Sequence, residues 1–215
     1  MRFILSLLRP FFYLLYHQFA WTYDFVAAVV SLGHWKDWLL GVLPYIEGQR
    51  VLELGHGPGH LQVALNEKGY QVYGLDESRF MGWLASRRLK KKAFPVRLSR
   101  GYAQELPWAN ETFDCILSTF PSEYIFDPRT LAEVHRVLLP GGRAVVLPLA
   151  WITGGRPLER LAAWLFRVTG QAQGKPGQLN PVVRKRFEAA GFGVRSQAVN
   201  LGPSLLLVIV ATKRG

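Results

Sequence analysis

The stretch Arg50–His60, RVLELGHGPGH, interrupts a short apolar run with three glycines at alternate positions. The run 51–54 predicts a buried strand, and the apolar spacing after His60 predicts a helix. A glycine loop at such a turn lets backbone N–H groups approach a ligand, and the helix offers its positive end. Two ligands fit this loop, an adenosyl methyl donor and a nicotinamide dinucleotide.

The spacing of the glycines favours the methyl donor. Counted from Gly55, a dinucleotide fingerprint Gly-x-Gly-x-x-Gly needs its third glycine at position 60, where this chain has His60. A bound pyrophosphate requires the helix to pack closely on the strand, and His60 would hinder that packing. A ligand without phosphate makes no such demand, so S-adenosylmethionine is favoured and NAD stays as the alternative.

Asp76 is the second element of the predicted site. It ends the next predicted strand, 71–76, and follows Gly55 by 21 residues. A carboxylate at this place can accept both ribose hydroxyls of a nucleoside, in NAD enzymes as in others. The simpler alternative is that Asp76 only caps the following helix.

Composition limits the class of protein. A chain of 215 residues, 49% of them apolar, predicts one domain with a sizeable core. The single cysteine, Cys115, excludes an internal disulfide framework and indicates a reducing, cytoplasmic compartment. Because Cys115 lies within an apolar run, we expect a buried and inert thiol. We expect no metal site.

The formal net charge is +11, and the excess is clustered. The segment 79–100 holds eight cations and no acid. Such a balance indicates an anionic partner, which could be a membrane surface, a nucleic acid or an acidic substrate. The simpler alternative is a solvated helix end whose cations complement the helix dipole.

Two segments predict contact with a membrane surface. The first, 3–16, is apolar except for Arg9 and Pro10, and its 14 residues are short of the roughly 20 that span a bilayer. The second, 151–170, predicts an amphipathic helix with arginines beside its apolar stripe. In both segments a helix packed on the domain is the alternative. We expect residues 1–45 to form an N-terminal helical segment or lid, and 46–215 the main domain, with an amphipathic insertion at about 151–180.

Strand and helix patterns alternate from Arg50 onward. Strands are predicted at 51–54, 71–76, 94–99, 112–120 and 142–150, and helices at 60–68, 77–92 and 127–139, the last stopped by Pro140-Gly141-Gly142. A helix at 181–190 precedes strands 193–199 and 204–213, whose short joint forces a hairpin. The sequence therefore predicts an α/β fold: a doubly wound, Rossmann-like sheet of seven strands, mostly parallel, with an antiparallel C-terminal hairpin. Its ligand site should lie at the carboxyl ends of the first strands.

At four places in order the chain resembles class I S-adenosylmethionine-dependent methyltransferases, over about 20–213. The matching stretches are VLELGHGPG, the Asp76 junction, the pair QELPW and FDCI, and LAEVHRVLLPGG (131–142). Within that family, Tyr23-Asp24, Ser31-Leu32-Gly33 and Trp38 resemble the opening of the ubiquinone/menaquinone-biosynthesis C-methyltransferases, the methyltransferase type 11 branch. The resemblance implies S-adenosylmethionine as cofactor and S-adenosylhomocysteine as product.

The resemblance also implies site residues. Gly55, Gly57 and Gly59 would wrap the methionine moiety, with Glu53 ordering the loop. Asp76 would hold the ribose, with Glu77 nearby. Relatives usually carry an acidic adenine contact where this chain has Tyr102, so the backbone of Tyr102 and Ala103, or the Tyr102 ring, would take its place. Ser118 and Phe120 would face the donor, and Tyr23 would belong to a lid.

Methyl transfer needs mainly proximity and a dry pocket, because the sulfonium is already activated. An acceptor that loses a proton also needs a general base, for which the candidates are His17, Asp24, His34 and Glu123. The sequence favours a lipophilic or small-molecule acceptor at the inner face of a membrane. The alternatives are an RNA methyltransferase that uses the basic patches and a donor-binding assembly factor without turnover. The oligomeric state is not fixed by the sequence.

Overall fold

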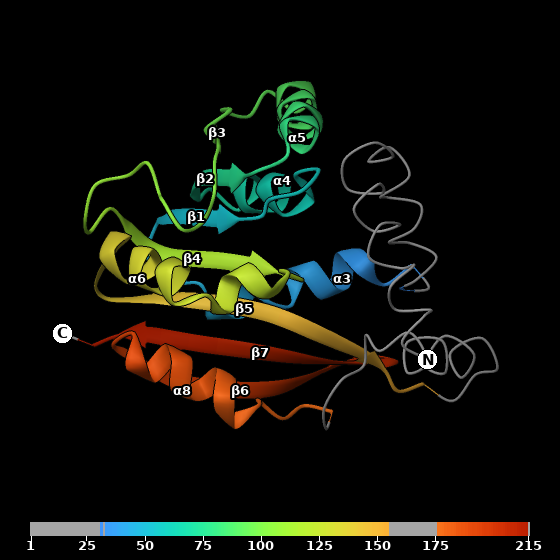
Figure 1. Cartoon of the computed structure of the whole chain (residues 1–215). Helices are drawn as coiled ribbons and strands as arrows, with labels where there is room; N and C mark the ends of the chain where they lie inside the picture. The colour runs from blue at the N-terminus through green and yellow to red at the C-terminus, as the bar shows by residue number, and fades with distance from the viewer. Residues whose placement is uncertain (1–30, 32, 155–175, 215) are drawn as a thin grey trace, which may run out of the picture.

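The computed structural model describes residues 31, 33–154 and 176–214, which build one seven-stranded sheet with helices on both faces (Figure 1). The strands are β1 (Arg50–Leu54), β2 (Gln71–Asp76), β3 (Leu98–Arg100), β4 (Phe113–Thr119), β5 (Leu138–Ile152), β6 (Phe192–Leu201) and β7 (Ser204–Lys213). The helices are α3 (Trp35–Leu40), α4 (His60–Glu67), α5 (Arg79–Lys91), α6 (Pro128–Val137) and α8 (Pro181–Ala189), with short 3-10 turns η2 (Leu43–Tyr45) and η3 (Glu123–Phe126).

The sheet has the order β3-β2-β1-β4-β5-β7-β6. Strands β1 to β5 pair in parallel, and β7 runs antiparallel to both β5 and β6. The hairpin between β6 and β7 turns at Gly202, which takes a positive φ of 56°. The predicted doubly wound α/β sheet with an antiparallel C-terminal hairpin is therefore confirmed.

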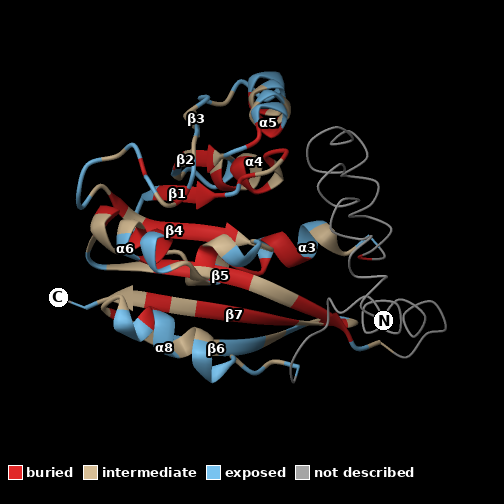
Figure 2. Cartoon of the chain, in the orientation of Figure 1, coloured by how far each residue is buried: buried red, intermediate tan, exposed pale blue. Residues whose placement is uncertain are grey.

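Two hydrophobic cores cover the two faces of the sheet. On one face α6 and α8 contribute Leu131, Val134 and Phe187. On the other face α3 and α4 contribute Trp38 and Leu65. Figure 2 shows the central strands buried and the outer surfaces of α5 and α8 exposed. Because both faces are covered, the parallel strands read as continuous apolar runs in the sequence.

Cys115 lies within the second core. Its side chain is fully buried, and burial raises the pKa of the thiol to about 12. The thiol therefore stays protonated at neutral pH and packs as a small apolar group. The expected inert cysteine is confirmed.

The junction between α6 and β5 differs from the prediction. Helix α6 ends at Val137 rather than at Leu139, and β5 begins at Leu138 instead of position 142. Leu138 already pairs with Phe113, and the register then jumps so that Cys115 pairs with Arg143. The Pro140-Gly141-Gly142 segment is thus a bulge inside the strand, not a stop after the helix. A Cβ on Gly142 would come within 2.9 Å of the Asp114 carbonyl oxygen, which explains the glycine.

Two of the other boundaries that differ from the prediction have a local cause. The third strand covers only Leu98–Arg100, whereas 94–99 was expected. Pro95 has no N–H to donate, and the strand lies at the edge of the sheet, so pairing starts late. Helix α5 starts at Arg79 rather than at position 77, because Ser78 is its N-cap and accepts a hydrogen bond from the Met81 N–H.

The domain limits expected at 1–45 and 151–180 fall largely outside the described residues. His17, Tyr23 and Asp24 also lie outside them, as does most of the predicted amphipathic helix. Within the described part of the chain, no helix has the length and apolarity needed to cross a bilayer.

Arg136, in the α6 segment LAEVHRV, holds the loop that contains Leu106, Trp108 and Asn110. Arg136 of α6 donates to both carboxylate oxygens of Glu133, each at 2.7 Å. It also donates to the carbonyl oxygens of Leu106 and Trp108, at 3.0 and 2.8 Å, and to the side chain of Asn110. Glu133 in turn accepts from the Leu106 N–H at 2.7 Å. The hydrogen bonds of Arg136 lower the pKa of Glu133, so the pair is ionised at neutral pH.

We predict that Arg136→Ala lowers the free energy of unfolding by about 2–4 kcal/mol, because it leaves backbone carbonyls and a carboxylate without their donor. Arg129→Ala is the matched control, since Arg129 is an exposed arginine of the same helix. Urea denaturation measures both variants. Equal stability of the two would contradict a structural role for the Arg136 hydrogen bonds.

Candidate functional site

The glycine loop 55–59 lies where β1 ends and α4 begins, beside the end of β2. Gly55, Gly57 and Gly59 all have positive φ angles of 70°, 51° and 83°. Other residue types adopt such angles only at a cost, so the backbone needs glycine here. The predicted glycine loop is therefore built from left-handed residues at the carboxyl edge of the sheet.

The three glycines do different things. A Cβ on Gly55 would come within 2.6 Å of the Tyr124 hydroxyl, and a Cβ on Gly59 within 2.8 Å of Ala85 on α5. Gly59 thus allows α5 to pack against the start of α4. A Cβ on Gly57 would meet nothing within 4 Å. Gly57 is therefore the position of the loop where a ligand could approach the backbone.

Asp76 ties this loop to the second strand. Its Oδ2 accepts from the Gly57 N–H at 2.9 Å, and its Oδ1 accepts from the Ser78 N–H at 2.8 Å. The N-cap of α5 is Ser78, so the alternative in which Asp76 caps this helix is wrong. A carboxylate next to Gly57 would repel a pyrophosphate at the same amide. The carboxylate suits the ribose hydroxyls that both candidate ligands carry, so only the Gly57 amide, already bonded to Asp76, speaks against a dinucleotide.

His56 was not expected from the sequence. Its ring is buried, and Nδ1 lies 2.7 Å from the Gly57 carbonyl oxygen, to which it donates. Burial lowers the pKa of His56, and the charge of Asp76 partly opposes this shift. Gly57 is thus held at its N–H by Asp76 and at its carbonyl by His56. The spacing of the glycines gave no signal for this role.

Glu53 is a buried carboxyl at the end of β1. Its Oε2 accepts from Gln62 Nε2 of α4 at 2.8 Å, and that amide also donates to the Tyr73 carbonyl at 3.2 Å. Burial raises the pKa of Glu53 to about 8; the hydrogen bond from Gln62 opposes this shift and the charge of Asp76 adds to it. The Gln62 amide therefore links α4 to Glu53 of β1 and to Tyr73 of β2 next to the loop.

Tyr124 and Ser118 close the other side of the loop. Ser118 Oγ donates to the Leu54 carbonyl oxygen at 2.9 Å. The Tyr124 hydroxyl lies 3.2 Å from that same oxygen and 3.2 Å from Ser118 Oγ. Burial of this hydroxyl raises the pKa of Tyr124. The sequence predicted Ser118 at the site but gave no signal for Tyr124, which reaches it from η3.

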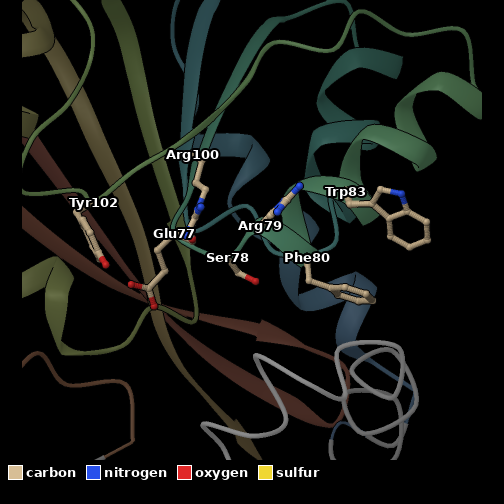
Figure 3. A pocket seen from close by; sticks show the side chains of 7 residues that line it. All are labelled: Glu77, Ser78, Arg79, Phe80, Trp83, Arg100 and Tyr102. Atoms are coloured by element: carbon tan, nitrogen blue, oxygen red, sulfur yellow. Dashed lines mark hydrogen bonds between the residues drawn. The ribbon is translucent and has the colours of Figure 1, made fainter.

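A cavity of about 550 Å³ opens next to Asp76. It is lined by Glu77, Ser78, Arg79, Phe80, Trp83, Arg100 and Tyr102 (Figure 3). The predicted residues Glu77 and Tyr102 are thus brought together, and the Tyr102 side chain is 66% exposed. Ala103, also predicted, is buried in the core beside it. The cavity offers a carboxylate and a phenol ring at the end of β2 and β3.

An aromatic wall stands at the end of β4. Phe120 has a positive φ of 49°, and its ring stacks on Trp35 of α3 with centroids 4.6 Å apart. Trp38 lies 5.9 Å from the same ring. Two of the candidate bases are described. His34 precedes α3, with its Nδ1 3.5 Å from Asp37 Oδ2. Glu123 is exposed at the start of η3. The structure brings neither base into contact with the glycine loop.

Comparisons with known proteins agree with this geometry. Residues 51–142 match a family described as a methyltransferase domain. Demethylmenaquinone methyltransferase of Symbiobacterium thermophilum is 32% identical over 72% of this chain and 63% of its own length. The enzyme of the same name from Thermobifida fusca is 30% identical over 72% of this chain and 67% of its own length. The chain thus spans about two thirds of the length of these curated relatives.

The fold has solved counterparts. A SAM-dependent methyltransferase from Thermotoga maritima superimposes with a TM-score of 0.61 at 21% identity, covering 89% of this chain and 94% of that one. The chain belongs to the S-adenosylmethionine-dependent methyltransferases. Its relatives include proteins named for the methylation of demethylmenaquinone.

We predict that Gly57→Ala weakens S-adenosylmethionine binding at least tenfold, because the new methyl group fills the space through which a ligand reaches the backbone. The cost in folding free energy should be only about 1 kcal/mol, the price of a left-handed alanine. Gly69→Ala is the control, since Gly69 has a φ of 85° and equally open surroundings. Calorimetric titration and urea denaturation of both variants measure the effect. Unchanged affinity in Gly57→Ala would place the ligand elsewhere.

A second prediction concerns pH. The pKa of Glu53 is about 8 in the folded protein, above its value of 4.5 in the unfolded chain. Stability contributed by the protonated form is fully present below pH 4.5 and is lost as pH rises through 8. Glu53→Gln removes this loss, so its stability relative to the wild type should rise between pH 5 and pH 8. Denaturation midpoints across this range test it, and a constant difference would refute the raised pKa.

Proposed function

We propose that this chain transfers a methyl group from S-adenosylmethionine to a small lipophilic acceptor of the quinone type, at or near a membrane surface. The observation that carries the proposal is the arrangement of Gly57, which has open space where a Cβ would lie and donates its N–H to the Asp76 carboxylate. The names of the relatives supply the acceptor class. The bound donor supplies an activated methyl group, and the protein supplies position and a dry surrounding.

The residues of the site fit the donor. In this proposal Asp76 accepts the ribose hydroxyls while it keeps the Gly57 and Ser78 N–H groups, because each carboxylate oxygen can accept a second hydrogen bond. Glu77 and Tyr102 border the adenine, with the backbone of Ala103 behind them. Gly55, Gly57 and Gly59 follow the methionine end, above Glu53. An ammonium group near Glu53 would favour its ionised form, since opposite charges lower a carboxyl pKa.

The acceptor side is formed by the end of β4. Ser118 and Tyr124 fix the carbonyl of Leu54, so the loop on the donor side is rigid where it faces this strand. The stacked rings of Trp35 and Phe120 offer an aromatic wall that suits a planar aromatic acceptor. Methylation of a ring carbon forms one C–C bond, breaks the S–CH₃ bond and releases one ring proton. Glu123, which precedes Tyr124 in η3, is the described candidate base that would receive that proton in this proposal.

The test begins with Asp76→Asn. Loss of one charged acceptor of ribose hydroxyls should lower S-adenosylmethionine affinity about 10- to 100-fold in calorimetric titration. Asp37→Asn, an exposed acid on α3, is the control. Wild-type affinity in Asp76→Asn would remove Asp76 from the site.

The acceptor is tested by incubating the purified chain with labelled S-adenosylmethionine and a reduced demethylnaphthoquinone in detergent. We expect the label to appear on the quinol, and its transfer to stop in Asp76→Asn. If RNA in a parallel reaction becomes labelled while the quinol stays unlabelled, the chain is an RNA methyltransferase instead. Donor binding with no transfer to either would leave a binding protein without turnover.

A further inference from the structure

Helix α5 carries an exposed face of aromatic and cationic side chains. Arg79, Phe80, Trp83, Arg87, Lys90 and Lys91 form this α5 face, and all six are exposed. Phe80, Trp83 and Arg87 recur at helical spacing, while Met81, Ala85 and Leu89 on the opposite side are buried. Trp83 is 52% exposed, although large apolar side chains of the described chain are mostly buried.

The cations of α5 divide into two groups. Arg88 donates to the Pro58 carbonyl oxygen, and Lys92 pairs with Glu67 at 3.0 Å, so these two hold α5 against the rest of the domain. Arg79, Arg87, Lys90 and Lys91 form no salt bridge with a described acid. Contacts within the domain account for Arg88 and Lys92, and the helix dipole favours Lys90 and Lys91 in the last turn. Arg79 and Arg87 have neither role, so the α5 face keeps a positive charge that suits an anionic partner.

The aromatic side chains indicate what that partner is. The Phe80 and Trp83 rings lie 5.5 Å apart at 40°, and the Arg87 guanidinium lies 5.5 Å from the Trp83 ring centroid. Figure 3 shows both rings projecting from α5. Trp beside cations on one helix face matches the boundary between lipid headgroups and acyl chains, where an apolar ring and charged groups are both satisfied. An RNA strand would call for bases stacked along a groove.

The α5 face lies next to the candidate site. Phe80 and Trp83 line the same cavity as Glu77, which follows Asp76 in the chain. The α5 face thus adjoins the carboxyl edge of the sheet, where the glycine loop lies. We infer that the α5 face docks this protein on an anionic lipid bilayer and so brings the site to a lipid-soluble acceptor. The lipid-soluble acceptor rests on the proposed function, whereas the docking surface rests on the exposed residues of α5.

The test is co-sedimentation of the full chain with vesicles of equal parts phosphatidylglycerol and phosphatidylcholine, and with pure phosphatidylcholine vesicles. We expect binding to the anionic vesicles that weakens with salt, and little binding to the neutral ones. In Trp83→Ser/Arg87→Ser, partitioning should fall about fivefold for the lost cation and about tenfold for the lost ring. The matched control is Val182→Ser/Lys185→Ser, an exposed apolar and cationic pair on α8.

The outcomes separate this inference from the proposed function. Equal loss in the α8 control, no loss in the α5 variant, or no preference for anionic vesicles would each overturn it. Salt-dependent binding of single-stranded RNA that is lost in the α5 variant, without vesicle binding, would replace lipid by RNA. Urea denaturation verifies that the variants are folded, and S-adenosylmethionine titration of the wild-type chain reports on the proposed function independently. Vesicle binding without donor binding would refute only the proposed function.

Discussion

The hydrogen bond between the Gly57 amide and the Asp76 carboxylate is the contact on which the site depends. It exists because β1 and β2 are parallel neighbours in which Leu54, the last residue of β1, is in register with Leu75, directly before Asp76 at the end of β2. Each strand then ends at the same edge of the sheet, and the residues that follow meet there. A shift in this register would separate Gly57 from Asp76, whatever the loop sequence.

Buried polar groups keep this edge in one arrangement. Gln62 bonds Glu53 below the loop, His56 holds the Gly57 carbonyl, and Ser118 with Tyr124 holds the Leu54 carbonyl. In a low-dielectric interior an unpaired polar group is costly, so a fully paired set favours a single loop conformation. A preformed loop loses less conformational entropy when it binds a ligand than a mobile one does.

The sequence predicted those parts of the molecule that depend on local patterns. The glycine loop, Asp76 and the order of strands and helices follow from spacing and periodicity, and the hairpin follows from its short joint. Tyr124, His56 and Gln62 could not be predicted, because their partners are set by tertiary packing. The bulge at Gly141-Gly142 was read as a helix stop for the same reason: the two glycines serve the pairing of β5 with β4, which a single segment does not reveal.

Phe120 shows how the acceptor side is made by tertiary contacts. A bulky residue at a φ of 49° stores about 1–3 kcal/mol of backbone strain. Two contacts hold it there, the 2.7 Å hydrogen bond from its N–H to the Leu147 carbonyl and the stacking on Trp35. Neither contact can be read from the segment around Phe120, since Leu147 and Trp35 lie far from it in the chain. Strain of this kind persists where the surrounding structure over-determines a position, which is frequent at ligand sites. The aromatic wall at the end of β4 is therefore a positioned surface, as the proposed site for a flat acceptor ring requires.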